Sequence, residues 1–289
     1  MKPAQKFKKG AAIAALLTCA ACAPVNFLNA ITPSGSYGLS NDIAYGDHAR
    51  QKLDVYTANS DTGEKPLIVF IHGGSWNSGD KNIYKFLGQG FTQEGYSVII
   101  PNYRLYPEAR FPDFMTDGAE AVKWVDQAYP DRDIILIGHS AGAHTALNIA
   151  LNDVYLMQVG LDRCTKLAGV VGLAGPYGRG PFTEEPYITI FPDRNKGDDA
   201  PLNLARHSAP PLLLLTGDAD ETVHPANSQL LADKITARGG KARAKSYQGV
   251  SHTGIVQHLS QYFDEDETIK ADIIDFIEKL PNAPSQNCQ

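Results

Sequence analysis

Continuous apolar runs alternate with longer amphipathic stretches along most of the chain, from residue 51 onward. This alternation is typical of βαβ units built around a parallel sheet. The run Leu67–Ile71 is apolar at every position, as expected for a strand buried on both faces. The alternating residues 53–56 predict an edge strand. Further strands are predicted at 97–101, 133–137, 167–173, 212–216 and 242–247.

The amphipathic stretches predict the helices that cover this sheet. In the last of them, apolar residues from Ile269 to Leu280 recur at spacings of three and four positions and form one apolar face. The sequence therefore predicts an α/β fold with a mostly parallel central sheet and helices on both faces. The expected helices lie at 83–94, 114–129, 141–151, 228–238 and 265–280.

One α/β domain is predicted over residues 46–282, because its length is within the range of a single unit and no internal repeat occurs. Residues 175–207 lack periodicity, contain several Gly and Pro residues, and lie between two expected core strands. We expect a short cap insertion there. Residues 22–45 are expected to be a tether and N-terminal arm, and residues 283–289 a C-terminal tail.

The N-terminal residues have the pattern of an export signal. Four lysines within the first nine residues precede an uncharged, mostly apolar run of 12 residues, 10–21. That run is too short to span a bilayer as a helix, which takes about 20 residues, so residues 1–21 predict a secretory signal peptide.

The signal ends in Ala20-Ala21-Cys22, which resembles the lipobox of bacterial lipoproteins. The resemblance implies that Cys22 is lipidated and tethers the exported protein to a membrane, in the bacterial periplasm or cell envelope. Cys19 stands at the third position before Cys22, where the lipobox usually has Leu. Ordinary signal cleavage near Ala21 or Ala23 is the alternative, although Pro24 disfavours cleavage after Ala23.

Charge and cysteine content bear on the partners. The formal net charge is -6, and no block of Lys and Arg occurs beyond the first nine residues, which argues against a nucleic-acid partner. Beyond the signal and Cys22, only Cys164 and Cys288 remain, and neither has metal-ligand spacing. In an oxidising compartment the two could pair or stay free. The sequence indicates no particular oligomeric state.

The strongest candidate chemistry is the pentapeptide G-H-S-A-G at residues 138–142, which follows an expected strand and opens an expected helix. This is the strand-turn-helix context of a nucleophile elbow, in which Ser140 stands clear of the sheet at a helix N-terminus. Its backbone is strained, and side chains at Gly138 and Gly142 would collide. A serine in a Gly-rich turn that only caps the helix is the alternative.

A second Gly-rich motif, H-G-G-S-W at residues 72–76, ends the strand Leu67–Ile71. Its glycines allow backbone N–H groups to turn toward the top of the sheet. Such groups stabilise the oxyanion of acyl transfer, and we expect the donors to be the amides of Gly74, Ser75 and Ala141. His72 is expected to position the loop and not to take part in catalysis.

An activated serine needs a base that is itself held by an acid, in the chain order Ser, Asp or Glu, His. Asp218 and Asp220 follow a buried strand; we choose Asp220 as the acid and expect Asp218 to support the turn. His252 lies in a loop of small residues after the last strand and is the expected base. His224 is the rival, but it lies only four residues after Asp220.

These motifs resemble those of a known group of enzymes. The H-G-G-S-W loop and the G-H-S-A-G-A-H elbow at 138–144 are similar to motifs of α/β-hydrolases related to kynurenine formamidase, bacterial carboxylesterases and bifunctional feruloyl and acetyl-xylan esterases. The segment Y-R-L-Y-P-E at 103–108 resembles one shared with hormone-sensitive-lipase-like esterases. His139, Ser75 and Trp76 depart from the pattern of that last group and favour the formamidase and carboxylesterase side.

The resemblance implies an α/β-hydrolase fold and a serine hydrolase that cleaves a small-molecule carboxylic ester, of short-chain or aryl type, with a Ser140-Asp220-His252 triad and without metal or organic cofactor. Hydrolysis of an arylformamide is one alternative. A surface lipoprotein that keeps the fold as a non-catalytic binding module is another.

Overall fold

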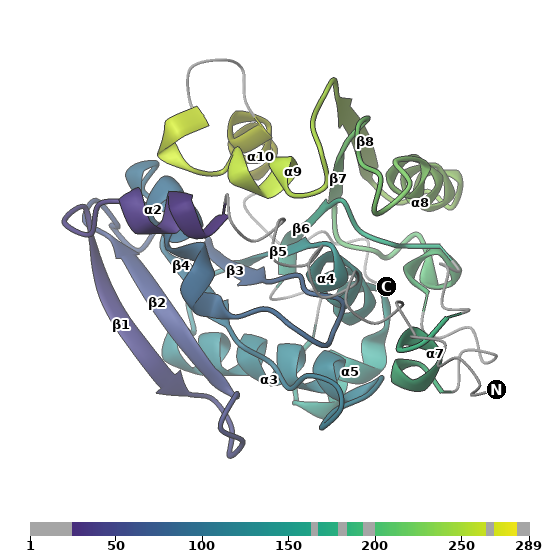
Figure 1. The fold of residues 1–289 in the computed structure, drawn as a ribbon, viewed down its shortest axis with the longest axis horizontal. Helices are drawn as coiled ribbons and strands as arrows, with labels where there is room; N and C mark the ends of the chain where they lie inside the picture. The colour runs from purple at the N-terminus through teal and green to yellow at the C-terminus, as the bar shows by residue number, and fades with distance from the viewer. Residues whose placement is uncertain (1–24, 163–166, 179–183, 193–199, 264–268, 282–289) are drawn as a thin grey trace, which may run out of the picture.

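The computed structural model describes residues 25–162, 167–178, 184–192, 200–263 and 269–281. Its centre is an eight-stranded sheet in the order β1-β2-β4-β3-β5-β6-β7-β8 (Figure 1). The pairings β1·β2 and β2·β4 are antiparallel, and all the others are parallel. The strands are β1 (Tyr37–Ala44), β2 (Lys52–Ala58), β3 (Leu67–Ile71), β4 (Val98–Pro101), β5 (Ile134–His139), β6 (Leu167–Leu173), β7 (Leu212–Gly217) and β8 (Ala242–Tyr247).

The first strand of the sheet lies in the segment that we expected to be an arm. β1 pairs along β2, so the sheet begins at Tyr37, before residue 46. The expectation of an edge strand at 53–56 is wrong, because β2 lies between β1 and β4. β1 forms this edge of the sheet. Most of its side chains are exposed, which is why it lacks the apolar pattern that reveals the central strands.

Two helical layers cover the sheet, as the sequence predicts. On one face lie α3 (Asp113–Ala128), α4 (Ala141–Leu151), α5 (Asp153–Gln158) and α8 (Ala226–Ala237). On the other lie α2 (Lys85–Gln93), α9 (Gly254–Gln257) and α10 (Ile269–Glu278). Figure 1 shows α2 and α10 on one side of the central strands and α3 and α5 on the other.

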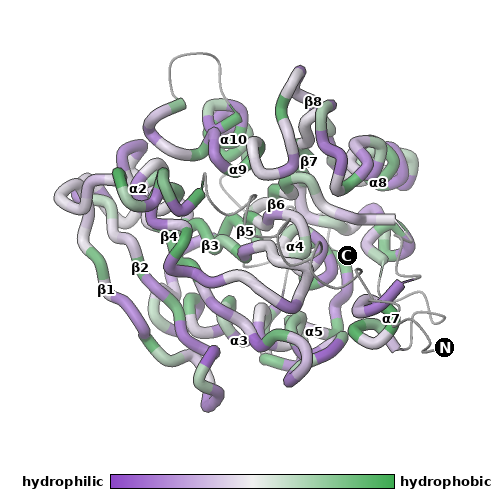
Figure 2. Tube along the Cα trace, viewed as in Figure 1, coloured by the Kyte–Doolittle hydropathy of each residue, from purple (hydrophilic) through white to green (hydrophobic). Residues whose placement is uncertain are grey.

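The side chains of β3 explain both layers. Leu67, Val69 and Ile71 pack into the core on the α3 and α4 face. Ile68 and Phe70 pack into the core on the α2 and α10 face. A strand that alternates between two apolar layers has to be apolar throughout, and Figure 2 shows the central strands as hydrophobic.

The structure also contains short helical segments that the sequence did not predict. The helix expected at 83–94 begins later, at Lys85, because its first two residues belong to a 3-10 turn, η1 (Lys81–Tyr84), which the Asp80 side chain caps. Two others are η3 (Pro201–Leu204) and η4 (Gln261–Phe263). A helical segment at 25–31 precedes β1.

The insertion expected at 175–207 lies between β6 and β7. Its described residues include a short helix, α7 (Tyr187–Ile190), whose last residue joins the core on the α3 and α4 face. Cys22, Cys164 and Cys288 lie outside the described residues. Among the helices that the structure describes, none is long and apolar enough to cross a bilayer.

Candidate active site

Ser140 occupies a strained turn between β5 and α4. Its φ of 55° and ψ of -121° lie in a region that non-glycine residues rarely adopt. A Cβ at Gly138 would lie 2.3 Å from the carbonyl oxygen of Gly142, across the turn. A Cβ at Gly142 would lie 2.1 Å from the carbonyl oxygen of Ile71 at the end of β3. Both glycines are therefore required by close backbone approach, one within the elbow and one against the neighbouring strand.

The structure brings Ser140, His252 and Asp220 together in one chain of hydrogen bonds. The Oγ atom of Ser140 lies 2.9 Å from Nε2 of His252, and Nδ1 of His252 lies 2.8 Å from Oδ2 of Asp220. Because a carboxylate only accepts hydrogen bonds, Nδ1 carries the proton and Nε2 is free to accept the serine hydroxyl. Ser140 and His252 are 112 positions apart in the sequence, and Asp220 and His252 are 32 positions apart.

Asp220 is buried and is held by the loop that carries it. Its Oδ1 accepts the backbone N–H groups of Thr222 and Val223, each at 2.8 Å. Burial by itself would raise the pKa of Asp220. The hydrogen bonds from His252 and from the two amides outweigh this effect and keep the pKa below its usual value. The carboxylate is therefore ionised at neutral pH.

The two rival residues accept hydrogen bonds from backbone amides instead. Asp218 accepts the backbone N–H of Gly249 at 2.7 Å, which ties the loop after β7 to the loop after β8. Nδ1 of His224 accepts the backbone N–H of Ala226 at the start of α8. In both contacts the side chain stabilises the conformation of a loop backbone.

His139, next to the nucleophile, contacts the loop of His252. Its Nε2 lies 2.9 Å from the backbone carbonyl oxygen of His252, so this nitrogen carries the ring proton and donates it. Burial and, to a smaller extent, the neighbouring His252 together lower the pKa of His139 to about 3. The ring is therefore neutral over the physiological range and fixes His252 without placing a second charge beside it.

The loop at 72–76 lies directly beside the nucleophile. A Cβ at Gly73 would lie 3.1 Å from Cβ of Ser140. The next three residues, Gly74, Ser75 and Trp76, have φ values of 125°, 53° and 58°. Successive residues of this kind turn the backbone sharply, and such turns can direct N–H groups into a shared concavity.

Trp76 and His72 anchor this loop at its two ends. The Trp76 side chain is buried, donates its indole N–H to Oγ1 of Thr145 at 3.3 Å, and packs on Phe191. His72 is buried, and the rings of Tyr103 and Tyr84 stack on it with centroid distances of 4.4 and 6.2 Å. Burial lowers the pKa of His72 to about 4, so the ring is neutral. These contacts agree with a positioning role for His72.

His139 and Trp76 belong to the two sequence motifs, but the sequence indicated no contact of either side chain within the site, and it did not single out Tyr187. The Oη atom of Tyr187, on α7, donates to Oγ of Ser75 at 3.1 Å. A signal for Trp76 was present in the sequence. A large aromatic side chain in a Gly-rich turn indicates that the side chain is buried against a neighbouring element. Tyr187 lies in a segment without periodicity, and no local signal marks it.

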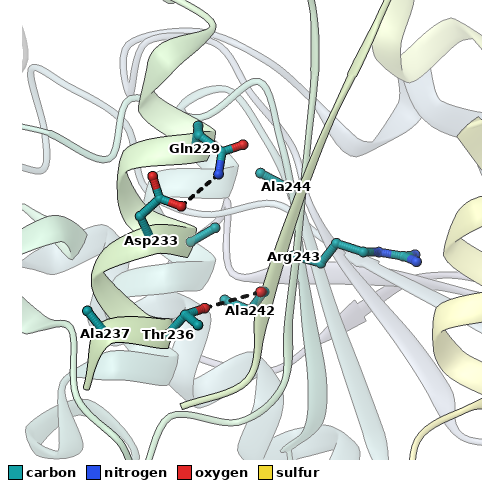
Figure 3. Close-up of a pocket in the computed structure, with 8 residues that line it drawn as sticks. Gln229, Asp233, Thr236, Ala237, Ala242, Arg243 and Ala244 are labelled. Atoms are coloured by element: carbon teal, nitrogen blue, oxygen red, sulfur yellow. Dashed lines mark hydrogen bonds between the residues drawn. The ribbon is translucent and has the colours of Figure 1, made fainter. Parts of the chain in front are cut away.

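A pocket between α8 and β8 lies apart from these residues. Figure 3 shows Gln229, Asp233 and Thr236 on the helix facing the strand, with Asp233 accepting a hydrogen bond from Gln229 at 2.7 Å. Thr236 donates to the backbone of Ala242. No residue of the Ser140 cluster lines this pocket. Within the described ranges, no group of three His, Cys, Asp or Glu side chains is arranged to hold a metal ion.

Comparison with solved structures identifies the fold. Esterase B from Lactobacillus rhamnosis superposes with a TM-score of 0.76 at 20% identity, over 92% of this chain and 94% of that one. A carbohydrate esterase from gut microbiota, in a truncated form, superposes with a TM-score of 0.71 at 21% identity, over 86% of this chain and 98% of that one. Together with the strand order, these likenesses establish an α/β-hydrolase fold.

Sequence comparison indicates which branch of the α/β-hydrolases the chain resembles. The family model described as BD-FAE matches residues 53–177. Isoprenylcysteine α-carbonyl methylesterase ICME of Arabidopsis thaliana is 28% identical over 74% of this chain and 56% of its own length. Kynurenine formamidase of Drosophila melanogaster is 23% identical over 75% of this chain and 76% of its own length. The chain thus spans about half the length of the first of these relatives, and it resembles the esterase and kynurenine formamidase branch of the α/β-hydrolases.

Proposed function

We propose that the protein is a serine hydrolase that cleaves carboxylic esters of short-chain or aryl type through an acyl-enzyme. The observation that carries this proposal is the unbroken chain of hydrogen bonds from Ser140 through His252 to Asp220, with distances of 2.9 and 2.8 Å. Its geometry is that of a nucleophile, a general base and an orienting acid. The esterases among the relatives support the same reading.

In the first half of the proposed reaction, Oγ of Ser140 attacks the ester carbonyl carbon while Nε2 of His252 takes the serine proton. The carbonyl electron pair moves onto the oxygen and forms a tetrahedral oxyanion. When the intermediate collapses, the C–O bond to the alcohol breaks and His252 returns the proton to the leaving oxygen. In the second half, His252 takes a proton from a water molecule as that water attacks the acyl carbon. When the second tetrahedral intermediate collapses, the bond from the acyl carbon to Oγ of Ser140 breaks, His252 returns the proton to Oγ, and the carboxylic acid leaves.

Two groups assist without changing covalently. The ionised Asp220 keeps the proton on Nδ1 of His252 and stabilises the imidazolium that forms during each half-reaction. The amides of Gly74, Ser75 and Ala141 stabilise the oxyanion. Removing a single donor of this kind typically costs about 3–4 kcal/mol of transition-state stabilisation.

Replacing the nucleophile tests the proposal. Ser140→Ala is expected to lose nearly all turnover of p-nitrophenyl acetate, because the acyl-enzyme can no longer form. The matched control is Ser40→Ala, at an exposed position on the edge strand β1, which should retain wild-type turnover. Full retention of activity by Ser140→Ala would reject the assignment.

A second candidate keeps the machinery and changes the bond to that of an arylformamide. The likeness to kynurenine formamidase of Drosophila melanogaster supports it. The predicted export signal weighs against it, because tryptophan catabolism is cytoplasmic. Turnover of N-formylkynurenine should be compared with turnover of short aryl esters; a higher kcat/KM for the formamide would favour this candidate.

A non-catalytic binding module would require that the triad be inert. A fluorophosphonate probe phosphonylates an activated serine and leaves an unactivated one unmodified. We expect Ser140 to be labelled, and an unlabelled protein would favour the binding module.

We also propose that the protein is exported and lipid-anchored at Cys22, which would place the hydrolase at a bacterial membrane surface. Mass spectrometry of the mature N-terminus tests this proposal. A lipid adduct on Cys22 that is absent from Cys22→Ser and present in Cys19→Ser supports it. An unmodified N-terminus near Ala21 or Ala23 contradicts it.

A further inference from the structure

The three residues at the turn of the 72–76 loop all have positive φ, and two of them are not glycine. Each such non-glycine residue costs about 1–3 kcal/mol and persists only where its surroundings hold it. The question is therefore what holds Ser75 and Trp76 in place. In the proposed reaction the answer matters, because the amide of Ser75 is one of the oxyanion donors.

The side chain of Trp76 is held by burial. Its indole ring is 2% exposed and packs edge-on against Phe191 with ring centroids 4.8 Å apart. Its N–H donates to Thr145 on α4. Trp76 thus joins the loop to the helix that begins at the nucleophile.

The side chain of Ser75 is held by one residue of the insertion. Oη of Tyr187 donates to Oγ of Ser75 at 3.1 Å, and the Tyr187 ring lies edge-on to Trp76 at 6.3 Å. The helix that carries Tyr187 is itself docked. The backbone N–H of Phe111 donates to the carbonyl oxygen of Ile190 at 2.8 Å, one turn after Tyr187.

We propose that Tyr187 is a positioning residue of the oxyanion hole: its hydroxyl holds Ser75 and thereby keeps the Ser75 amide directed at the developing oxyanion. This inference rests on the proposed function and extends it to the insertion at 175–207. The insertion then contributes to the rate of the chemical step. The contact acts on the transition state, because the amide meets full negative charge only in the tetrahedral intermediate.

Tyr187→Phe isolates the hydroxyl, since phenylalanine keeps the ring beside Trp76. With a short aryl ester, we expect kcat to fall about five- to tenfold, in line with the loss of one hydrogen bond, while KM changes less than about twofold. Ser75→Ala removes the other partner and should lower kcat similarly. The double variant should be no slower than the slower single variant, because both changes remove one shared contact.

The matched control is Tyr262→Phe, which removes a tyrosine hydroxyl that donates to the backbone of Ile31, away from the site. It should leave kcat unchanged. A trifluoromethyl ketone, which forms a tetrahedral adduct with the serine, should bind Tyr187→Phe more weakly by about the same factor as the loss in kcat/KM.

Three outcomes would overturn the inference: unchanged kcat in Tyr187→Phe, a rise in KM alone, or losses that add in the double variant. A rise in KM alone would mean that Tyr187 contacts the substrate directly. Each of these is distinct from failure of the proposed function, in which the wild-type protein itself would neither hydrolyse the ester nor react with the fluorophosphonate.

Discussion

At the scale of single residues, the candidate site depends on which of two neighbouring aspartates contacts the imidazole. Asp218 and Asp220 are both in the loop after β7, and both accept backbone hydrogen bonds there. Only Asp220 has an oxygen atom at hydrogen-bond distance from His252. The two positions therefore form a matched pair for mutagenesis.

Asp220→Asn is expected to lower kcat by about 10³- to 10⁴-fold, because the amide can present its NH₂ group to His252 and favour the wrong tautomer. Asp218→Asn preserves an oxygen acceptor for Gly249, and its kcat should stay within about threefold of wild type. Steady-state kinetics on p-nitrophenyl acetate would measure both. A larger loss in Asp218→Asn than in Asp220→Asn would reverse the assignment.

At the scale of elements, the elbow joins β3, β5 and α4 so closely that no side chain fits between them. Gly142, in the first turn of α4, faces the carbonyl oxygen of Ile71 at the end of β3. This contact brings the 72–76 loop, which follows β3, beside Ser140. Gly142 therefore allows the close packing of α4 against β3 as well as the turn itself.

Gly142→Ala should destabilise the protein by several kcal/mol, because the new methyl group would overlap a strand backbone that cannot move without breaking sheet hydrogen bonds. Gly35→Ala is the control, since a Cβ there meets nothing within 4 Å. Its stability should stay within about 0.5 kcal/mol of wild type. Urea unfolding would measure both, and equal stabilities would show that the elbow can relax around a methyl group.

At the scale of the whole molecule, two buried neutral histidines link stability to pH. Burial lowers the pKa of His72 to about 4 and that of His139 to about 3, whereas an unfolded histidine titrates near 6.5. Between about pH 6.5 and pH 4 the unfolded chain thus binds protons that the folded chain does not. Stability rises with pH in this window and falls as the solution becomes more acidic, by at most about 1.4 kcal/mol per pH unit for each histidine.

The free energy of unfolding should therefore decrease between about pH 7 and pH 5, and His139→Gln should decrease less steeply than wild type. His207→Gln, at an exposed position, serves as the control and should keep the wild-type slope. Urea titrations at several pH values would give the slopes. A pH-independent wild-type stability over this range would contradict the argument.

The whole-molecule view also shows which parts of the fold could be predicted from sequence. β3 is apolar at every position and β7 at its first four, because both faces of these strands are buried, and composition alone indicates where they lie. β1 could not be found in the same way, because a strand at the sheet edge with mostly exposed side chains has no apolar period. Its omission led to the wrong prediction that 53–56 is the edge.

The sequence by itself determined the features that depend on local backbone and burial. These are the central strands, the two helical layers, and the elbow whose glycines permit a serine at positive φ. Only the tertiary structure decided which aspartate meets His252, that His139 holds the loop of His252, and that Tyr187 reaches Ser75. The physical reason is distance along the chain: these pairs are 32, 113 and 112 residues apart, so no local pattern encodes their contacts and only the packing of the sheet brings them together.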